Sequence, residues 1–301
     1  FIEGDKMEFS KKLYEYQKYI NSKFEVINDK SLNQHSLYLN KTINYSFLSN
    51  GKRIRPVMNI VFFEAFGGNK DDIINFSSAI EMIHTYSLIH DDLPAIDDDV
   101  LRRNRATSHI KFNEASAILA GDALLNLSYE TLFKYLNKNF SRNVLKACSY
   151  LANCAGKEGM IIGQIADVEL AMKNETLENL EFINQNKTGK MIKASIVTAG
   201  LIANQDQNTI QLLEKFSDNI GLAFQLKDDL LEVLTDEKTL GKSVDSDLRN
   251  DKKTYIKFMG IEKTERKLEE LRVRSFNILD ELNIGNEFIY ELTDYIFNRV
   301  N

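Results

Sequence analysis

The sequence predicts an all-α protein, and three observations carry this prediction. Only 2 prolines and 14 glycines occur in 301 residues, so residues that interrupt helices are rare. Apolar residues recur at helical spacing through most of the chain. No segment shows a convincing strand pattern, a repeat of fixed period or a linker. We therefore expect one domain covering residues 1–301, a single large helical bundle surrounding a central cavity.

Ten segments predict the helices of this bundle, each from apolar side chains at helical spacing. In chain order they cover residues 7–29, 36–49, 57–66, 71–90, 114–136, 142–172, 178–203, 208–234, 262–283 and 287–299. The breaks between them include GGN at 67–69, Pro94 and the polar loop 235–253. Gly189 interrupts the seventh segment and predicts a kink, which frees backbone carbonyls from the helical ladder.

The composition excludes several classes of function. A net charge of −6 and a pI of about 5.4 disfavour nucleic acid as a partner. No apolar run approaches the roughly 20 residues that span a bilayer, and no signal peptide pattern is present. Cys148 and Cys154 have no histidine nearby, which argues against a disulfide framework or zinc site and fits a reducing cytoplasm. One interpretation of residues 1–6 is that they were appended ahead of a natural start at Met7.

The segment 91–105, DDLPAIDDDVLRRNR, concentrates opposite charges. Five aspartates are followed by three arginines: Asp91, Asp92, Asp97, Asp98, Asp99, Arg102, Arg103 and Arg105. Carboxylates this close repel one another, and a hard cation such as Mg²⁺ removes that conflict because oxygen ligands suit it. The arginines offer planar forks for a diphosphate. For a charge run alone, a solvated acidic loop is the simpler interpretation, so the rest of the chain must decide.

A second acidic cluster lies within the apolar segment 208–234. Its members follow helical spacing and share one broad face: Gln225, Asp228, Asp229 and Glu232. If the two acidic helices face each other in one bundle, their carboxylates can hold more than one Mg²⁺ and, through these ions, a diphosphate.

Two smaller groups add basic and polar side chains. Lys52 and Arg55 lie three apart and would share a helix face, after a glycine that lets backbone approach an anion. His84, Ser87 and Asp91 are spaced three and four apart, so they also share a face. Taken alone, a short basic cluster is usually a solvated face, and a lone helical histidine is usually a core or surface residue.

Together these motifs resemble a known family. In order they are GKRIRP at 51–56, IHTYSLIHDDLPAIDDDVLRRNRATSH at 83–109, LAGDALL at 119–125, GQIAD at 163–167, KTG at 187–189, GLAFQLKDDLLE at 221–232 and LGK at 240–242. They resemble the trans-polyprenyl diphosphate synthases, and most closely the bacterial-type farnesyl diphosphate synthases (geranyltranstransferases). The resemblance extends over roughly residues 44–253 and implies the isoprenoid synthase type of helical bundle.

The resemblance implies Mg²⁺-dependent head-to-tail prenyl transfer from an allylic diphosphate to isopentenyl diphosphate. It implies three Mg²⁺ ions per active site, held by Asp91, Asp92, Asp97 and Asp228. The allylic diphosphate would be held by Arg102, Lys187 and Lys242, and isopentenyl diphosphate by Lys52, Arg55, His84 and Arg103. The carbocation would face the carbonyls near Lys187 and Thr188 and the amide oxygen of Gln225. The resemblance also implies a cytoplasmic homodimer.

Several positions depart from the usual family pattern. Glu232 replaces an aspartate, so the carboxylate survives on a longer arm, and Ala106 and Asp245 replace a proline and a glycine. Asn104 stands where glycine is usual in the sequence RRNRAT. Because asparagine tolerates positive φ, we expect the turn to persist.

Product length is predicted from the first motif. The inserted Pro-Ala and an aromatic residue five positions before the motif, Tyr86, resemble bacterial farnesyl diphosphate synthases. This resemblance implies that Tyr86 floors the hydrophobic tunnel and that the product has fifteen carbons. Ideal helix spacing instead points Ser87 nearer to the direction of Asp91, so Ser87 is a second candidate for chain-length control.

Four alternatives remain. A geranyl or geranylgeranyl diphosphate synthase would carry the same motifs. A class I terpene cyclase usually has an Asn/Ser/Glu triad at the second motif, where this chain has DDLLE, and a non-catalytic subunit tends to lose the aspartates kept here. A helical Ca²⁺-binding scaffold lacks support because no EF-hand pattern is present.

Overall fold

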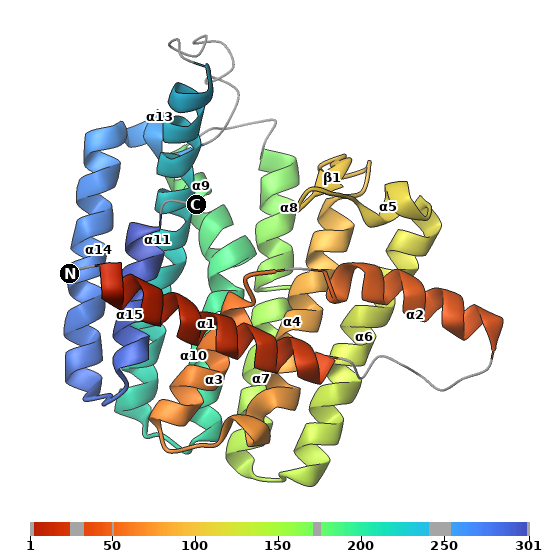
Figure 1. Cartoon of the computed structure of the whole chain (residues 1–301), viewed down its shortest axis with the longest axis horizontal. Coiled ribbons are helices and arrows are strands. Elements are labelled where there is room, and N and C mark those ends of the chain that lie inside the picture. Colours follow the sequence, from red (N-terminus) through yellow and green to blue (C-terminus); the bar gives the residue numbers. More distant parts are fainter. Residues whose placement is uncertain (1–2, 25–32, 50, 171–175, 241–253, 300–301) are drawn as a thin grey trace. The chain divides into compact units, whose positions relative to one another are not determined.

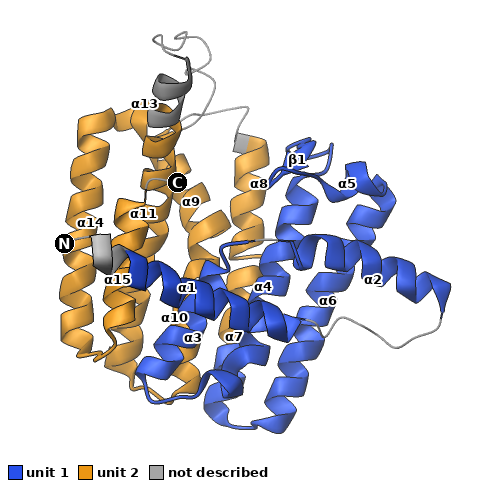
Figure 2. Ribbon diagram, viewed as in Figure 1, with its two compact units in different colours: residues 1–148 blue, residues 149–301 orange. Residues whose placement is uncertain are grey.

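A computed structural model describes residues 3–24, 33–49, 51–170, 176–240 and 254–299. Helix follows helix along the chain (Figure 1), which confirms the predicted all-α class. The chain divides into two compact units, residues 1–148 and 149–301 (Figure 2). Helix α7, Arg142–Ala155, runs across the boundary between them.

The first unit is built on one long central helix. Its helices are α1 (Glu3–Lys23), α2 (Gln34–Phe47), α3 (Ile54–Ala65), α4 (Lys70–Asp91), α5 (Ser108–Lys111) and α6 (Glu114–Lys138). Helix α4 packs along α6 and against α3, and it buries Ile73, Phe76, Ile80 and Ile83 at helical spacing. Its start is fixed by the side chain of Asn69, which accepts a hydrogen bond from the Asp71 amide at 2.9 Å.

A small hairpin follows the aspartate-rich segment, where the sequence predicted no strand. β1 (Leu101–Arg102) pairs antiparallel with β2 (Arg105–Ala106), and strands this short leave no alternation to detect. The two turn residues, Arg103 and Asn104, have φ values of 53° and 59°, as a two-residue hairpin turn of the primed type requires. The expectation that Asn104 would preserve the turn is confirmed.

The second unit packs its helices around α11. It contains α8 (Met160–Leu170), α9 (Leu177–Asn184), η2 (Gln185–Gly189), α10 (Lys190–Ile202), α11 (Gln207–Leu240), α13 (Tyr255–Met259), α14 (Ile261–Leu282) and α15 (Glu287–Asn298). Helices α10, α14 and α15 contact α11, and Leu213, Ile220 and Leu226 of α11 are fully buried. Two boundaries differ from expectation: the single helix predicted for 142–172 is broken before α8, and α11 continues past residue 234.

The kink predicted at Gly189 is confirmed as a π-helical turn, η2, between α9 and α10. Two glycines let neighbouring helices approach this turn closely. A Cβ built at Gly163 of α8 would overlap the backbone of Lys187, and one at Gly221 of α11 would lie 3.1 Å from the Gly189 Cα. The glycines of the GQIAD and GLAFQ motifs therefore pack against the turn that carries Lys187.

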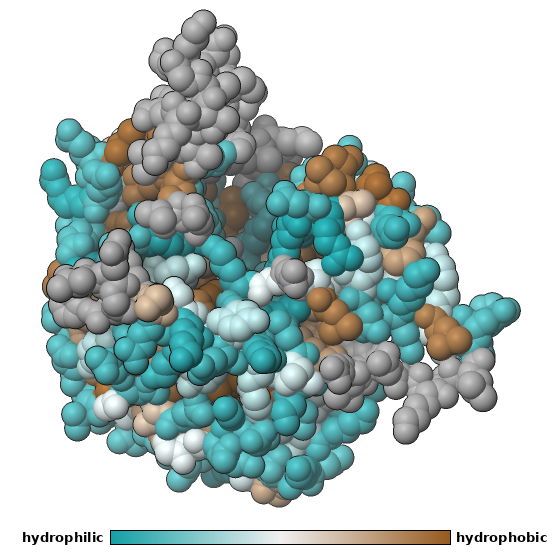
Figure 3. Space-filling view, viewed as in Figure 1, coloured by the Kyte–Doolittle hydropathy of each residue, from teal (hydrophilic) through white to brown (hydrophobic). Residues whose placement is uncertain are grey.

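The surface is largely hydrophilic on the face drawn in Figure 3. Near β1 and α5, hydrophobic side chains gather at the surface, where Leu101 and Ile110 are 63% and 53% exposed. Among the residues described, none of the helices combines the length and apolar character that a membrane crossing requires.

Candidate active site

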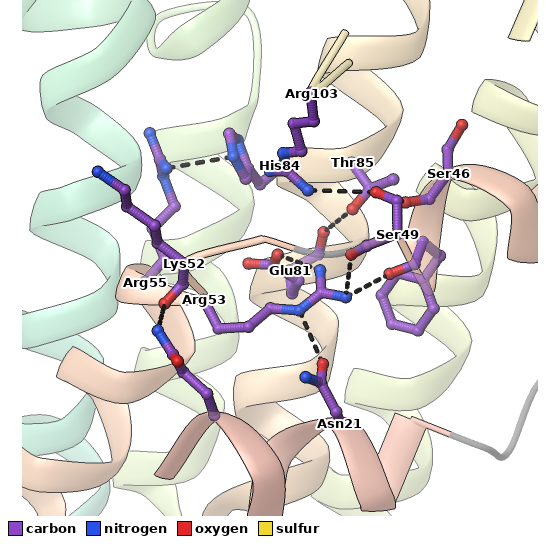
Figure 4. Close-up of polar contacts among 12 residues, drawn as sticks. Asn21, Ser46, Ser49, Lys52, Arg53, Arg55, Glu81, His84, Thr85 and Arg103 are labelled. Atoms are coloured by element: carbon purple, nitrogen blue, oxygen red, sulfur yellow. Dashed lines mark hydrogen bonds and ion pairs between the residues drawn. The ribbon is translucent and has the colours of Figure 1, made fainter. Parts of the chain in front are cut away.

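A cluster of basic side chains lies in the first unit, between the start of α3 and the middle of α4 (Figure 4). Arg55 and His84 are in contact, with 3.3 Å between Nη1 and Nε2. Arg103 extends from the hairpin turn and donates to the Ser49 hydroxyl at 3.2 Å. Lys52 is exposed, and its carbonyl accepts a hydrogen bond from the Gln17 side chain. The shared helix face predicted for Lys52 and Arg55 is wrong, because α3 begins at Ile54 and Lys52 lies before it. The contact of Arg55 with His84 agrees with their joint assignment from the resemblance.

The side chains of the cluster are partly removed from water, and their positive charges repel one another. Burial lowers the pKa of the Arg55 guanidinium, and the positive charge of Arg103 lowers it further. The pKa of His84 falls well below its usual value, first because the ring is buried and then because four arginines surround it. An anion placed here would meet several converging donors and would relieve the mutual repulsion of the cations.

This lowered pKa predicts a pH dependence of stability. The unfolded chain takes up a proton at His84 near pH 6.5, whereas the folded chain does not, so the free energy of unfolding falls as the pH drops below about 6.5. We expect His84→Asn to lose less stability than the unchanged protein between about pH 7 and pH 5.5 in urea denaturation. His35, an exposed histidine, provides the control: His35→Asn should keep the original pH dependence. Equal losses in the unchanged protein and in His84→Asn would contradict the prediction.

The first aspartate motif begins at the C-terminus of α4. Asp91 is the last residue of the helix, and its carbonyl accepts a hydrogen bond from the Asp97 amide at 2.9 Å. The loop therefore folds back so that Asp97 returns to Asp91. Asp92 is 4% exposed and forms an ion pair with Arg102, which also contacts Asp99. Burial raises the pKa of the Asp92 carboxyl, and the positive charge of Arg102 offsets part of that rise.

The second aspartate motif lies on α11, within the second unit. Asp228 forms an ion pair with Arg299, 2.6 Å from Nη2 to Oδ1, and the Arg299 guanidinium stacks on Phe224 at 3.9 Å. Asp229 accepts a hydrogen bond from the Tyr255 amide. Burial raises the pKa of Asp229 to about 6, with further contributions from the charges of Glu232 and Asp228.

The remaining predicted side chains of the second unit lie around the π-helical turn. Lys187 donates to Asp167 at 2.8 Å, and Thr188 follows it on η2. Gln225 lies half-buried on α11, which contacts η2. Lys242 lies outside the described residues, so its position stays a prediction.

The donor groups of the predicted metal ligands suit a hard cation. Across the described ranges, no three His, Cys, Asp or Glu side chains converge into a ready-made metal site. The predicted ligands offer only carboxylate oxygens, which suit a hard divalent cation, and Asp92 and Asp228 each already face a guanidinium. Since Mg²⁺ typically takes one or two carboxylates together with phosphate oxygens, this donor set fits it without a preformed cage.

Tyr86 and Ser87, the two candidates for chain-length control, differ in the surroundings of their side chains. Tyr86 is 6% exposed and packs edge-on against His90, with ring centroids 5.7 Å apart. Burial raises the pKa of its hydroxyl to about 12. The Ser87 hydroxyl turns back to the His84 carbonyl at 2.9 Å. Tyr86 is therefore the larger and more enclosed of the two side chains.

Sequence reasoning missed two partners of the predicted residues and one buried ion pair near them. Asp167, the ion-pair partner of Lys187, was visible only as the last residue of GQIAD. Arg299, the partner of Asp228, is 71 positions away in the chain, and no local pattern indicates such a contact. The buried pair of Arg53 and Glu81 also gave no signal, because each residue resembles an ordinary charged helix position.

Comparisons with known proteins cover both units. A sequence profile described as polyprenyl synthetase matches residues 36–281. The chain is 41% identical over 278 residues to a farnesyl diphosphate synthase of Micrococcus luteus, covering 91% of this chain and 94% of that protein. It is 36% identical over 291 residues to a geranylgeranyl diphosphate synthase of Cyanophora paradoxa, covering 94% and 96%. A solved geranyltransferase of Legionella pneumophila superposes with a TM-score of 0.85 at 28% identity, covering 97% and 98%.

Proposed function

The chain belongs to the polyprenyl synthetase family and is a prenyltransferase, and we propose that it condenses dimethylallyl and geranyl diphosphates with isopentenyl diphosphate to give farnesyl diphosphate. The observation that carries this proposal is the contact of Arg55 with His84, whose pKa is lowered by the charges of nearby arginines, because it supports a second anion site built from basic side chains. A terpene cyclase ionises one diphosphate and has no need of such a second site. The proposed reaction binds two diphosphates and uses both.

The proposed reaction proceeds by ionisation, condensation and loss of a proton. The C–O bond of the allylic diphosphate breaks, and the departing electron pair leaves with diphosphate. The double bond of isopentenyl diphosphate then forms the new C–C bond, and loss of a proton restores a double bond. Arg102, Lys187 and Lys242 would stabilise the departing diphosphate, which is electrostatic catalysis at a leaving group. Lys52, Arg55, His84 and Arg103 would orient isopentenyl diphosphate.

Membership in this family implies a divalent metal cofactor, and we propose three Mg²⁺ ions at Asp91, Asp92, Asp97 and Asp228. Bound metal supplies positive charge to the leaving diphosphate. The π-helical turn has carbonyls that are not paired in the α-helical pattern, which supports Lys187 and Thr188 as groups that face the carbocation. The Gln225 amide oxygen would add a further dipole. The released diphosphate would take the proton.

We further propose that the two compact units act as one catalytic domain. The family profile, residues 36–281, runs across the boundary near residue 148, and each unit carries one of the two aspartate motifs. A homodimer and a cytoplasmic location complete the proposal. The thiols of Cys148 and Cys154 are both free, which suits a reducing compartment.

The test is to supply dimethylallyl and isopentenyl diphosphates with Mg²⁺ and to separate the products by chromatography. We expect farnesyl diphosphate as the main product and no condensation once a chelator removes the metal. A twenty-carbon main product would replace the proposal with geranylgeranyl synthesis, which similarity to the Cyanophora paradoxa enzyme keeps in view. No condensation at all would contradict the proposed reaction.

In the same assay, Tyr86→Ala tests the chain-length residue. Removing this enclosed ring would deepen the tunnel, so we expect products of twenty carbons or more to become the majority. Ser87→Ala removes only a hydroxyl that is bonded to its own helix, and it should leave the product at fifteen carbons. The same product length from Tyr86→Ala and the unchanged protein would remove Tyr86 from this role.

A further inference from the structure

Arg53 and Glu81 form a buried ion pair in the middle of the basic cluster (Figure 4). The distance from Nη1 to Oε1 is 2.7 Å, and the two side chains are 1% and 3% exposed. Glu81 belongs to α4, and Arg53 precedes the first turn of α3. The pair therefore joins the segment between α2 and α3 to the central helix of the unit.

The other two guanidinium nitrogens of Arg53 also donate hydrogen bonds. Nη2 donates to the carbonyls of Phe47 and Ser49 at 2.8 Å each, and Nε donates to Asn21 at 3.0 Å. The guanidinium lies over the Phe24 ring, 5.2 Å from its centroid. Phe24 covers one face of the guanidinium, and each of its three nitrogens already donates a hydrogen bond. Arg53 is therefore not placed to bind an anion itself. It is a positioning residue and not a ligand.

The backbone at Arg53 is unusual as well. Its φ of 50° lies in the left-handed region, which costs a non-glycine residue energy and persists only where surrounding contacts fix it. The contacts with Glu81, Phe47 and Ser49 supply that constraint. They set the direction in which the chain enters α3.

Each basic residue assigned to isopentenyl diphosphate is linked to this pair by the adjacent backbone, by a shared helix face or by a hydrogen bond. Lys52 precedes Arg53, and Arg55 lies two positions after it in the first turn of α3. His84 lies three positions after Glu81 on α4, so the two side chains share a face. Arg103 bonds the hydroxyl of Ser49, the residue whose carbonyl Arg53 holds.

We propose that Arg53 and Glu81 are positioning residues that arrange Lys52, Arg55, His84 and Arg103 for the diphosphate of isopentenyl diphosphate. The inference rests on the proposed function and deepens it. Fold stability is a weak explanation for the pair, because a buried ion pair is often no more stabilising than apolar side chains of the same volume. A positioning role accounts for the left-handed backbone and for the flanking cations together.

If Glu81 acted only through its charge, its removal would strengthen anion binding by the basic cluster. The carboxylate of Glu81 raises the pKa values of Arg55 and Arg103, so it acts as a counter-charge within the cluster. Removing that charge without moving any residue would make the cluster more positive and would tighten anion binding. Arg53→Lys and Arg53→Met/Glu81→Met both leave the pair with a net charge of zero, so weaker binding in them reports positioning and not the loss of the Glu81 charge.

The test compares Arg53→Lys with the double variant Arg53→Met/Glu81→Met. Arg53→Lys keeps the charge but loses the planar fork, and we expect the KM for isopentenyl diphosphate to rise roughly 10- to 100-fold. The KM for geranyl diphosphate should change less than about twofold. The double variant replaces the pair by apolar side chains, should melt close to the unchanged protein, and should keep the raised KM.

Arg272→Lys is the matched control, because Arg272 forms an arginine–aspartate pair with Asp294 at 2.9 Å in the other unit. It should change neither the KM for isopentenyl diphosphate nor the KM for geranyl diphosphate.

A double variant that recovers both folding and the original KM would show that the pair is only structural. Calorimetric titration of isopentenyl diphosphate measures the same effect without turnover. If the unchanged protein binds and Arg53→Lys binds equally well, the positioning role is wrong and the function stands; if the unchanged protein does not bind, both are wrong.

Discussion

Asp91→Asn is expected to lower kcat roughly 1000-fold, an effect far larger than any loss of thermal stability. Asp91 and Asp92 place two negative charges at the C-terminus of α4, a helix of 22 residues. The helix dipole disfavours negative charge at that end, and the other aspartates of the motif add repulsion. Neutralising Asp91 therefore removes one charge from a cluster of carboxylates at an unfavourable helix end, while the proposed metal site loses an oxygen ligand.

The experiment pairs steady-state kinetics in Mg²⁺ with melting curves. Asp98→Asn is the matched control, because Asp98 belongs to the same cluster but is exposed. Its φ of 53° suits asparagine as well as aspartate, so the substitution adds no backbone strain. We expect this control to retain turnover within about threefold. Early melting of Asp91→Asn with normal turnover would contradict the metal role.

The helices could be predicted because their signal is local. Few breakers and a regular apolar spacing are enough to indicate α4 and α6, whose buried faces follow that spacing. The features that were missed are short or depend on packing. Two-residue strands have no periodicity to detect. The break before α8 falls between Gly156 and Gly159, two glycines that could have indicated it from the sequence.

The site could be predicted in parts. Helical spacing predicted a shared face for Lys52 and Arg55, and this was wrong because the left-handed backbone at Arg53 separates Lys52 from the start of α3. The contact of Arg55 with His84 and the pairing of Arg53 with Glu81 join α3 to α4, and no local pattern encodes a contact between two helices. The resemblance to a family supplied the role of His84, while only the structure shows how it is held.

Helix geometry gave an ambiguous view of chain-length control. Ideal spacing favoured Ser87 over Tyr86 as the neighbour of Asp91 in direction. In the structure, the Ser87 hydroxyl bonds its own helix, whereas Tyr86 is enclosed and packs against His90. Side-chain size and burial favour Tyr86 as the residue to test, and its role in chain length stays a prediction.

Lys187→Met is expected to lower kcat about 100- to 1000-fold, because the proposed role of Lys187 is to stabilise the diphosphate as it leaves. The lysine lies on the π-helical turn, and its backbone packs against Gly163 of α8. Such close backbone packing holds the residue in place, so the side chain alone is removed. Lys187→Arg keeps the charge and should recover part of the turnover.

Loss of an ion pair must be separated from loss of the positive charge at the leaving group. Lys193 of α10 forms the matched pair with Asp218, with Nζ–Oδ2 at 2.8 Å, the same distance as from Lys187 to Asp167. Such partly exposed pairs contribute only about 0–1 kcal/mol to stability. Lys193→Met should therefore leave kcat unchanged and cost little stability. If both methionine variants lost turnover equally, the effect would belong to packing around η2, and Lys187 would have no special role at the diphosphate.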